Sequence, residues 1–169
     1  MDNSSGMQTE EMKQMLIEYM EKGFLENIIA LFKTEPSLYG FIPDMLGQDN
    51  MRVRLGTAAL VEELIQGHGP ELRAIVPLLT RLLKHENPTV KGDAAYVLGI
   101  IKDPAAGGAL TEMLNDENAA VRESAREALR ITEIAYKAGA TTNIEVVEAQ
   151  QTARNAEVLA ALAEERLRQ

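Results

Sequence analysis

Three stretches of this chain can be laid over one another, and this internal repeat restricts the possible folds more than any other feature. They are NMRVRLGTAALVEEL from Asn50, NPTVKGDAAYVLGII from Asn87 and NAAVRESAREALRIT from Asn118. Each begins with Asn, has Val three residues later and then a cation, and the Asn residues are 37 and 31 positions apart. A second apolar segment precedes each stretch. Two helices recurring every 30 to 40 residues, roughly, are typical of a helical solenoid.

The residues of each repeat fit the second helix of such a pair. Asn is a good N-cap, because its side-chain oxygen accepts a hydrogen bond from an otherwise unpaired N–H. Pro88 then occupies the first helical position, where a missing N–H is harmless. Apolar residues recur at helical spacing and predict one buried face per repeat. These faces are Val53, Thr57, Leu60, Val61 and Leu64; Val90, Ala94, Val97, Leu98 and Ile101; and Val121, Ala125, Ala128 and Leu129.

Composition supports an all-α fold. The chain has 169 residues, of which 46% are hydrophobic but only 4% aromatic, so the core must be built mostly from Leu, Ile, Val, Met and Ala. No stretch alternates cleanly between apolar and polar residues, as a half-buried strand would. We therefore expect a short helical solenoid of about nine helices.

The pattern Asn-x-x-Val-cation followed by an Ala-rich helix resembles a HEAT repeat, of the short kind found in phycobilin-lyase-like proteins. DPAAGGALTEMLNDENAAVRESAREAL, from Asp103 to Leu129, is the best match, and the resemblance covers about residues 36–131. In that family the cation reaches back to the capping residue of a neighbouring repeat. The resemblance therefore implies a structural ladder of charge–dipole contacts, in which Lys91 is a rung rather than a catalytic base. The ladder comprises Asn50, Asn87 and Asn118 with Arg54, Lys91 and Arg122.

The two ends of the chain differ from the repeats. Residues 1–8 are expected to be disordered, and residues 9–35 to form an N-terminal helical cap that begins at Thr9 and has a helix stop at Gly23. A stripe of Met12, Met15, Leu16, Tyr19 and Met20 on this cap is either core, the favoured reading, or an adaptable binding face. Residues 36–131 would then hold the HEAT-like repeats.

Residues 132–169 are expected to form a C-terminal helical hairpin. One helix would run from Ala119 to Lys137, a turn would follow at Gly139, and a second helix would run from Thr142 to Arg166. The second helix carries a heptad seam in which five of seven members are Ala, and this seam is a candidate homodimer contact. The seam consists of Val146, Ala149, Ala153, Ala156, Ala160, Ala163 and Leu167.

Part of this hairpin resembles a second known segment. Residues 134–162 are similar to the tip of the periplasmic helical hairpin in TolC-type outer-membrane efflux proteins, where the adaptor protein docks. The matching residues are Tyr136, Gly139, Thr142, Val146, Val147, Glu148, Ala149 and Gln150. Common ancestry and convergence on a similar Ala-rich hairpin are both open, and efflux activity is not transferred on this likeness.

Residues for chemistry are scarce. His68 and His85 lack the spacing of a metal site, and no phosphate loop or nucleophile motif is present. We therefore expect no catalytic, metal-binding or cofactor-binding residue. The formal net charge is −9 and no segment is basic, which argues against nucleic acid as a partner. Without an apolar leader or spanning segment, we expect a cytoplasmic bacterial protein that does not insert into a membrane.

A surface for recognising other proteins is the remaining prediction. Second helices line the inner face of a HEAT solenoid, so the face opposite Val90 and Val97 is the candidate. Tyr96, between Gly92 and Gly99, is either the anchor of a partner site or a residue that packs on the adjacent repeat. The predicted partner-binding residues are Leu55, Ala59, Gly92, Tyr96, Glu123, Glu127 and Arg130.

These observations favour a non-catalytic scaffold or adaptor for an unknown protein partner. Two alternatives follow from the resemblances. One is an enzyme or enzyme subunit of the phycobilin-lyase-like HEAT class. The other is an accessory protein of an efflux system that acts through the TolC-like hairpin.

Overall fold

The computed structural model describes residues 3–139, and these residues form helices and loops without a strand. The elements are α1 (Asn3–Glu21), α2 (Leu25–Thr34), the 3₁₀ helix η1 (Pro36–Phe41), α3 (Ile42–Leu46), α4 (Met51–Arg73), α5 (Val76–Leu82), α6 (Pro88–Ile101), η2 (Pro104–Ala106), α7 (Gly107–Glu112) and η3 (Met113–Asn115). Residues 119–139 are also helical. The expected all-α fold is therefore confirmed.

The chain divides into two compact units, Met1–Thr132 and Glu133–Gln169. In the second unit, residues 133–139 are helical, with an ion pair of 2.7 Å between Lys137 Nζ and Glu133 Oε1. Gly139, where the turn of the hairpin was predicted, is helical and is the last described residue, so the turn itself stays a prediction. The predicted second helix of the hairpin, its Ala seam and most of the TolC-like segment lie outside the described residues.

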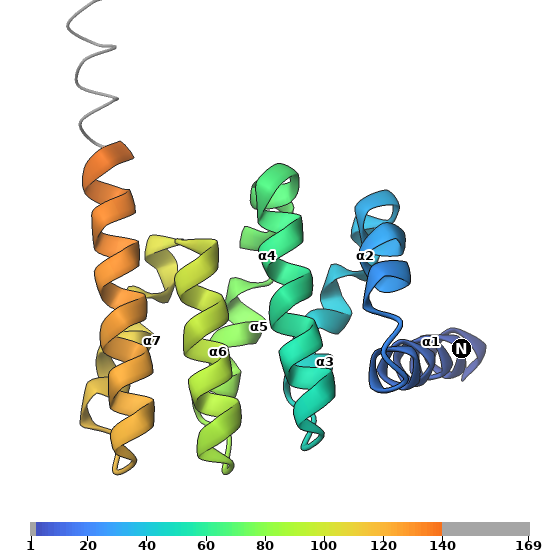
Figure 1. Ribbon diagram of the computed structural model, residues 1–169, viewed down its shortest axis with the longest axis horizontal. Coiled ribbons are helices and arrows are strands. Elements are labelled where there is room, and N and C mark those ends of the chain that lie inside the picture. Colours follow the sequence, from blue (N-terminus) through green and yellow to red (C-terminus); the bar gives the residue numbers. More distant parts are fainter. Residues whose placement is uncertain (1–2, 140–169) are drawn as a thin grey trace, which may run out of the picture. The chain divides into compact units, whose positions relative to one another are not determined.

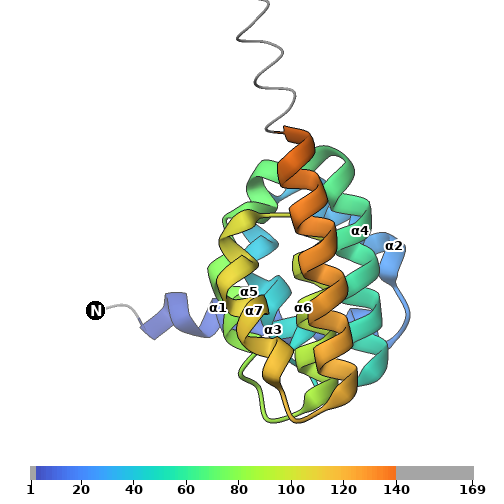
Figure 2. The ribbon, with the colours of Figure 1, turned by 90° about the vertical axis from the view of Figure 1, so that its left-hand side faces the viewer.

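Three helix pairs follow one another in the first unit. They are α3 with α4, α5 with α6, and α7 with the helix of residues 119–132. Figure 1 shows α4, α6 and the 119–132 helix, in orange, side by side. Figure 2 shows α3, α5 and α7 in a separate layer beside them. The repeat read from the sequence is thus a solenoid of two layers, with the second helices of all pairs in one layer.

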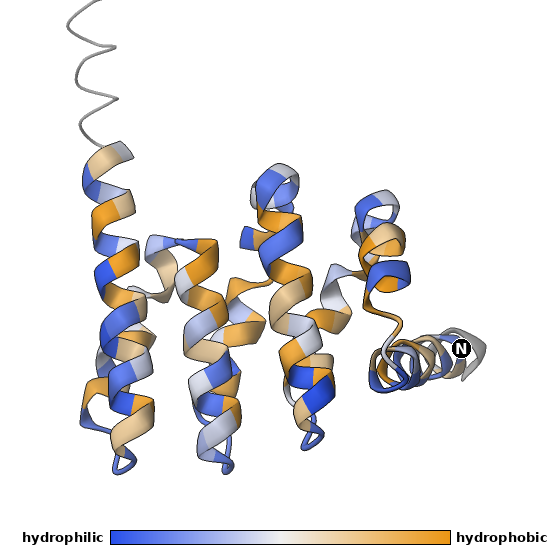
Figure 3. Cartoon of the chain, in the orientation of Figure 1, coloured by the Kyte–Doolittle hydropathy of each residue, from blue (hydrophilic) through white to orange (hydrophobic). Residues whose placement is uncertain are grey.

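The three predicted N-caps are present. The Asn50 side chain accepts a hydrogen bond from Arg52 N at 2.9 Å, Asn87 from Thr89 N at 2.9 Å, and Asn118 from Ala120 N at 2.9 Å. Asn50 and Asn87 have extended backbone angles, as a residue just outside a helix requires. Figure 3 shows the short loops that lead into these helices, at the lower ends, as hydrophilic.

The predicted apolar faces form the core between the two layers. The residues of the first two faces are at most 2% exposed, as are the first three of the last face, and Leu129 is partly buried. Thr57 is compatible with this core because its hydroxyl donates to Val53 O at 2.7 Å. The helical spacing of the sequence therefore identified the buried side of each second helix.

The first helices of the pairs are short and irregular. The segment from Leu38 to Leu46 is divided between η1 and α3, and the segment from Ala105 to Leu114 spans η2, α7 and η3. Proline lies in the first turn of several of these elements, at Pro36, Pro43 and Pro104. Because proline has no N–H to continue a helix that precedes it, each of these elements begins at or one residue before its proline.

The N-terminus departs from prediction. Helix α1 begins at Asn3 rather than Thr9, so residues 3–8, which were expected to be disordered, are helical. Of the predicted stripe, only Leu16 and Met20 are buried, while Met12, Met15 and Tyr19 are 37–45% exposed. Gly56 lets Met20 approach α4, since a Cβ built there would lie 2.3 Å from Met20 Sδ.

Helix α4 is kinked at His68. His68 has non-helical angles and Pro70 follows two residues later, yet the helix resumes and continues to Arg73. The His68 ring packs edge-on against Tyr39 with ring centroids 6.1 Å apart. The Tyr39 hydroxyl is buried without a hydrogen-bond partner among the described residues. Burial raises the pKa of Tyr39.

Candidate interaction surface

The ladder begins at Arg54, whose side chain is 5% exposed. Its Nε donates to Asp93 Oδ2 in the next helix pair at 2.8 Å. Its Nη1 donates to the backbone oxygens of Gln48 and Asp49 at 2.9 and 2.7 Å. One guanidinium therefore ties the loop before α4 to helix α6, and the buried charge is compensated by a carboxylate and two carbonyls.

Lys91 makes the corresponding contact one repeat further on. Its Nζ donates to Asp116 Oδ2 at 2.7 Å, across to the third helix pair. Asp116 also accepts from the backbone N–H of Asn118 at 2.9 Å, and its side chain is only 6% exposed. The hydrogen bond from Lys91, followed by that from the Asn118 N–H, holds the pKa of Asp116 below its usual range.

The partners of the ladder cations differ from those implied by the resemblance. Arg122 Nη1 donates to the backbone oxygens of Asp116 and Glu117 at 2.7 and 2.9 Å, and the other two cations pair with aspartates. The expected charge–dipole contacts between cations and Asn side chains are therefore wrong. Each Asn oxygen is already used in capping, whereas an aspartate offers a full charge and a free oxygen.

The Asn side chains contribute to the ladder through their amide groups instead. Asn50 Nδ2 donates to Glu21 Oε1 at 2.8 Å, and Asn87 Nδ2 lies 3.5 Å from Asp49 Oδ1. Arg52 Nη1 also donates to Glu21 O at 3.2 Å. The polar contacts on this edge thus run from the end of α1 to the loop before the 119–132 helix.

The predicted partner-binding residues all lie on second helices. Leu55 and Tyr96 project into solvent, with 56% and 50% of their surface exposed. Gly92 and Ala59 are partly buried, and Glu123, Glu127 and Arg130 are exposed. The structure brings four of the seven together between α6 and the 119–132 helix, namely Gly92, Tyr96, Glu123 and Glu127.

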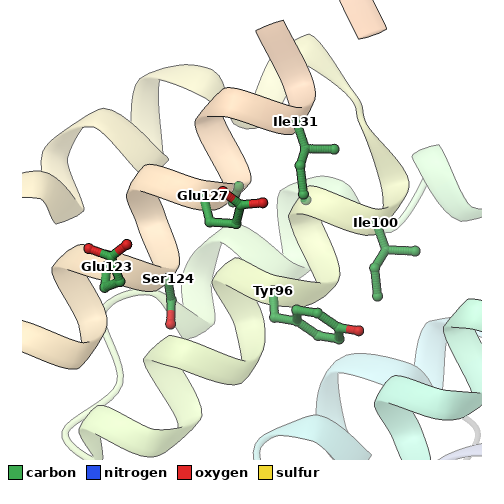
Figure 4. A pocket seen from close by; sticks show the side chains of 8 residues that line it. Tyr96, Ile100, Glu123, Ser124, Glu127 and Ile131 are labelled. Atoms are coloured by element: carbon green, nitrogen blue, oxygen red, sulfur yellow. The ribbon is translucent and has the colours of Figure 1, made fainter. Parts of the chain in front are cut away.

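Two adjoining hollows lie along this junction. The first, of about 430 Å³, is lined by Tyr96, Gly99, Ile100, Glu123, Ser124, Glu127, Ala128 and Ile131. The second, of about 300 Å³, shares Tyr96 and Ser124 and is further lined by Pro88, Thr89, Gly92, Asp93, Asn118 and Ala120. We call the two together the seam groove. Figure 4 shows the first hollow, with Tyr96 and Ile100 on α6 and Glu123, Ser124, Glu127 and Ile131 on the neighbouring helix.

Gly99 sets the closeness of the two helices that border the groove. A Cβ built on Gly99 would lie 3.1 Å from Ala128 Cα and 3.2 Å from its Cβ. A side chain at Gly99 would therefore push the 119–132 helix away from α6. Gly99 and Ala128 are in contact at the bottom of the groove, and Tyr96 lines the same hollow.

Tyr96 contacts the adjacent repeat, and it is also exposed on the face that is predicted to bind a partner. Its hydroxyl donates to Glu62 Oε1 on α4 at 2.5 Å, so it contacts the adjacent repeat. Its ring nevertheless borders both hollows and stays half exposed. The hydrogen bond to Glu62, with burial as the smaller cause, raises the pKa of Tyr96. The hydrogen bond to Glu62 thus fixes the position of the ring, and half of the residue's surface stays exposed to solvent.

The glutamates on this face form ion pairs with arginines of the same helix. Glu123 pairs with Arg126, and Glu127 pairs with Arg130 at 2.6 Å. These four side chains are 53–72% exposed, so the pairs are weak and readily exchanged. The hydrogen bond from Arg130 lowers the pKa of Glu127, which keeps that carboxylate charged.

A third hollow lies near the N-terminal end of the same face. It measures about 500 Å³ and is lined by Met20, Gly23, Leu25, Met51, Arg52, Leu55, Gly56 and Ala59. Leu55 and Ala59 therefore lie here and not in the seam groove. Sequence analysis missed Met51, although Met51 and Leu55 are four residues apart and both lie off the predicted core face of α4.

Groups suited to catalysis are sparse in the described part of the chain. No cluster of three or more His, Asp or Glu residues there could hold a metal ion. His85 Nδ1 accepts a hydrogen bond from Asn87 N at 3.0 Å, and His68 packs on Tyr39. Both histidines therefore have structural contacts. Over the same residues, no helix is both long and apolar enough to cross a membrane.

The fold and the face define a class: an α-helical repeat protein with an open, hollowed surface on its second helices. A family model described as HEAT repeats matches residues 44–130, which is just over half of the chain. The chain belongs to the HEAT-repeat family. A comparison with curated proteins found no match.

Proposed function

We propose that this protein is a non-catalytic scaffold that binds a protein partner through the face formed by α4, α6 and the 119–132 helix. HEAT repeats generally serve as protein-interaction scaffolds. The observation that carries the proposal is the half-exposed Tyr96, held by Glu62 and bordered by two hollows. Fixed aromatic side chains in hollows are common anchors of protein interfaces, because they bury a large area at little entropic cost.

Site-specific photocrosslinking in the native cell tests this proposal. A photoreactive phenylalanine analogue replaces Tyr96 in one variant and Leu78 in a matched control. Leu78 lies on α5, in the other helix layer, and is 37% exposed. We expect discrete protein adducts from position 96 and few from position 78. Equal adducts at both positions, or a bound chromophore or small-molecule substrate recovered with the protein, would overturn the scaffold proposal.

The finer resemblances remain alternatives. A lyase-like enzyme or enzyme subunit would bind a chromophore, which absorbance of the protein purified from its native cell would reveal. An efflux accessory would lose its crosslinked partners when residues 141–169 are deleted. We propose the scaffold in preference to both because the described residues offer an open face rather than a deep pocket with a titratable group.

The proposal also covers the boundaries between the segments of the chain and the role of the C-terminal extension. We propose residues 3–35 as the N-terminal cap, residues 36–131 as the repeats and residues 132–169 as an extension that joins two copies. Deleting residues 141–169 should then convert a dimer to a monomer, as measured by light scattering. A parent protein that is already monomeric would refute the dimer. The net charge of −9 supports a protein partner over nucleic acid, and a cytoplasmic location is part of the proposal.

A further inference from the structure

The seam groove has the dimensions of a short peptide segment. It extends along α6 from Pro88, at the first turn, to Ile100, near the last. Twelve residues of helix rise about 18 Å at 1.5 Å per residue. About five residues of an extended chain span the same length at roughly 3.3 Å each. A segment of a partner protein therefore fits the groove better than a folded domain does.

The lining of the groove combines an apolar wall with carboxylates. Tyr96, Ile100 and Ile131 supply apolar surface at one end. Glu123 and Glu127 lie on the helix opposite Tyr96, whereas Asp93, which borders the adjoining hollow, is already paired with Arg54. No Lys or Arg is among the described residues that line either hollow. The groove thus offers negative charge next to an aromatic ring, without a cation of its own inside.

This combination is complementary to a lysine or arginine side chain. The methylene stem of such a residue is apolar and its head is charged, so the two parts prefer different surfaces. The stem would lie on Tyr96 and Ile100, and the head would reach Glu123 or Glu127. A cation beside the Tyr96 ring would gain a further attraction to its face. The exposed arginines that now pair with these glutamates would be displaced at little cost.

We propose that the seam groove binds a segment of a partner protein in which a lysine or arginine is flanked by apolar residues. This inference rests on the proposed scaffold function and specifies the chemistry of its partner. A phosphate-bearing ligand is disfavoured because the carboxylates around the groove and the net charge of −9 would repel it.

Selection from a random dodecapeptide display library against the full chain tests this inference. We expect enriched peptides to carry Lys or Arg next to Leu, Ile, Val or an aromatic residue. An enriched peptide, labelled and followed by fluorescence anisotropy, should bind the double variant Glu123→Gln/Glu127→Gln at least tenfold more weakly. Tyr96→Ala should weaken it as much. Raising the salt concentration should weaken binding to the unmodified chain, because the charges are exposed.

A matched control removes the same charge elsewhere. The double variant Glu26→Gln/Glu112→Gln changes two exposed glutamates that do not line the groove, and it should bind the peptide as the parent does. Equal losses in both double variants would show a general charge effect and overturn the inference. So would enriched peptides without cations, or a library that yields no binder. Crosslinked protein adducts at position 96 would, in each of these cases, leave the scaffold function standing.

Discussion

Nε of Arg54 lies 2.8 Å from Oδ2 of Asp93, and this ion pair links the first helix pair to the second. The arginine side chain is 5% exposed and the aspartate side chain 26% exposed. The same guanidinium holds two carbonyls of the loop before α4. The Arg54 side chain therefore links two repeats and also fixes the loop before α4.

Removing Arg54 should destabilise the protein strongly. Arg54→Ala leaves two loop carbonyls without their donor and leaves Asp93 without its cation. We expect a loss of about 2–4 kcal/mol in the free energy of unfolding, less than for a fully buried pair because Asp93 is partly solvated. Urea unfolding followed by circular dichroism measures this. Arg81→Ala, at an exposed position on α5, should change stability by less than about 0.5 kcal/mol. A similar small change for Arg54→Ala would refute the ladder as a source of stability.

The last rung should contribute less. Arg122 holds only the carbonyls of Asp116 and Glu117, so Arg122→Ala should cost about 1–2 kcal/mol. Arg126 lies one turn further on and makes only an exposed pair with Glu123. Arg126→Ala should therefore stay within about 0.5 kcal/mol of the parent. Melting temperatures of the two variants that do not differ would contradict this ranking.

Asp116 should make stability depend on acid pH. Its pKa is lowered in the folded state, so the unfolded chain binds more protons at pH values between the folded and the unfolded pKa. Stability from this group is therefore fully present above the unfolded pKa and is lost as the pH falls through the folded pKa. Asp116→Asn should flatten the dependence of the urea midpoint on pH below about 4, which is near the ordinary pKa of Asp. Glu112→Gln, an exposed control on α7, should leave the dependence unchanged.

Two glycines of α6 should respond oppositely to alanine. At Gly99 a methyl group would meet the backbone of Ala128 at 3.1 Å, and overpacking of this kind costs about 1–3 kcal/mol. At Gly92 the nearest atom is Ser124 Oγ at 3.4 Å, which is ordinary contact. Gly92→Ala should gain up to about 1 kcal/mol from helix propensity, whereas Gly99→Ala should lose stability. Thermal unfolding of the two variants measures the difference, and equal shifts would mean that α6 and the 119–132 helix do not meet at Gly99.

The buried hydroxyl of Tyr39 should cost stability. It has no hydrogen-bond partner among the described residues, and a buried unsatisfied polar group carries a penalty of about 1–3 kcal/mol. Tyr39→Phe removes the hydroxyl and keeps the ring beside Phe32 and His68. We expect the variant to unfold at a higher urea concentration than the parent. Tyr96→Phe is the control, because it deletes a hydroxyl that is bound to Glu62 and should not raise stability. A less stable Tyr39→Phe would mean that the hydroxyl has a partner, such as a buried water.

Local sequence determined much of this protein. The Asn caps, the spacing of apolar residues and the prolines act within a turn or two of the chain, so they specified the three second helices and their buried faces before any contact was known. The surface opposite those faces could be named for the same reason, including Tyr96. The start of α1 at Asn3 was not predicted, because residues 3–8 carry no apolar stripe that would indicate a helix.

Only the tertiary structure decided which residues meet across repeats. Arg54 and Asp93 are 39 positions apart, and Lys91 and Asp116 are 25 apart, so no local spacing pairs them. The sequence shows that each cation needs a partner, but several acids compete for it. Their distances depend on how the helix pairs stack. The seam groove has the same origin: it exists because Gly99 lets two helices touch at Ala128 while Tyr96 is held aside by Glu62.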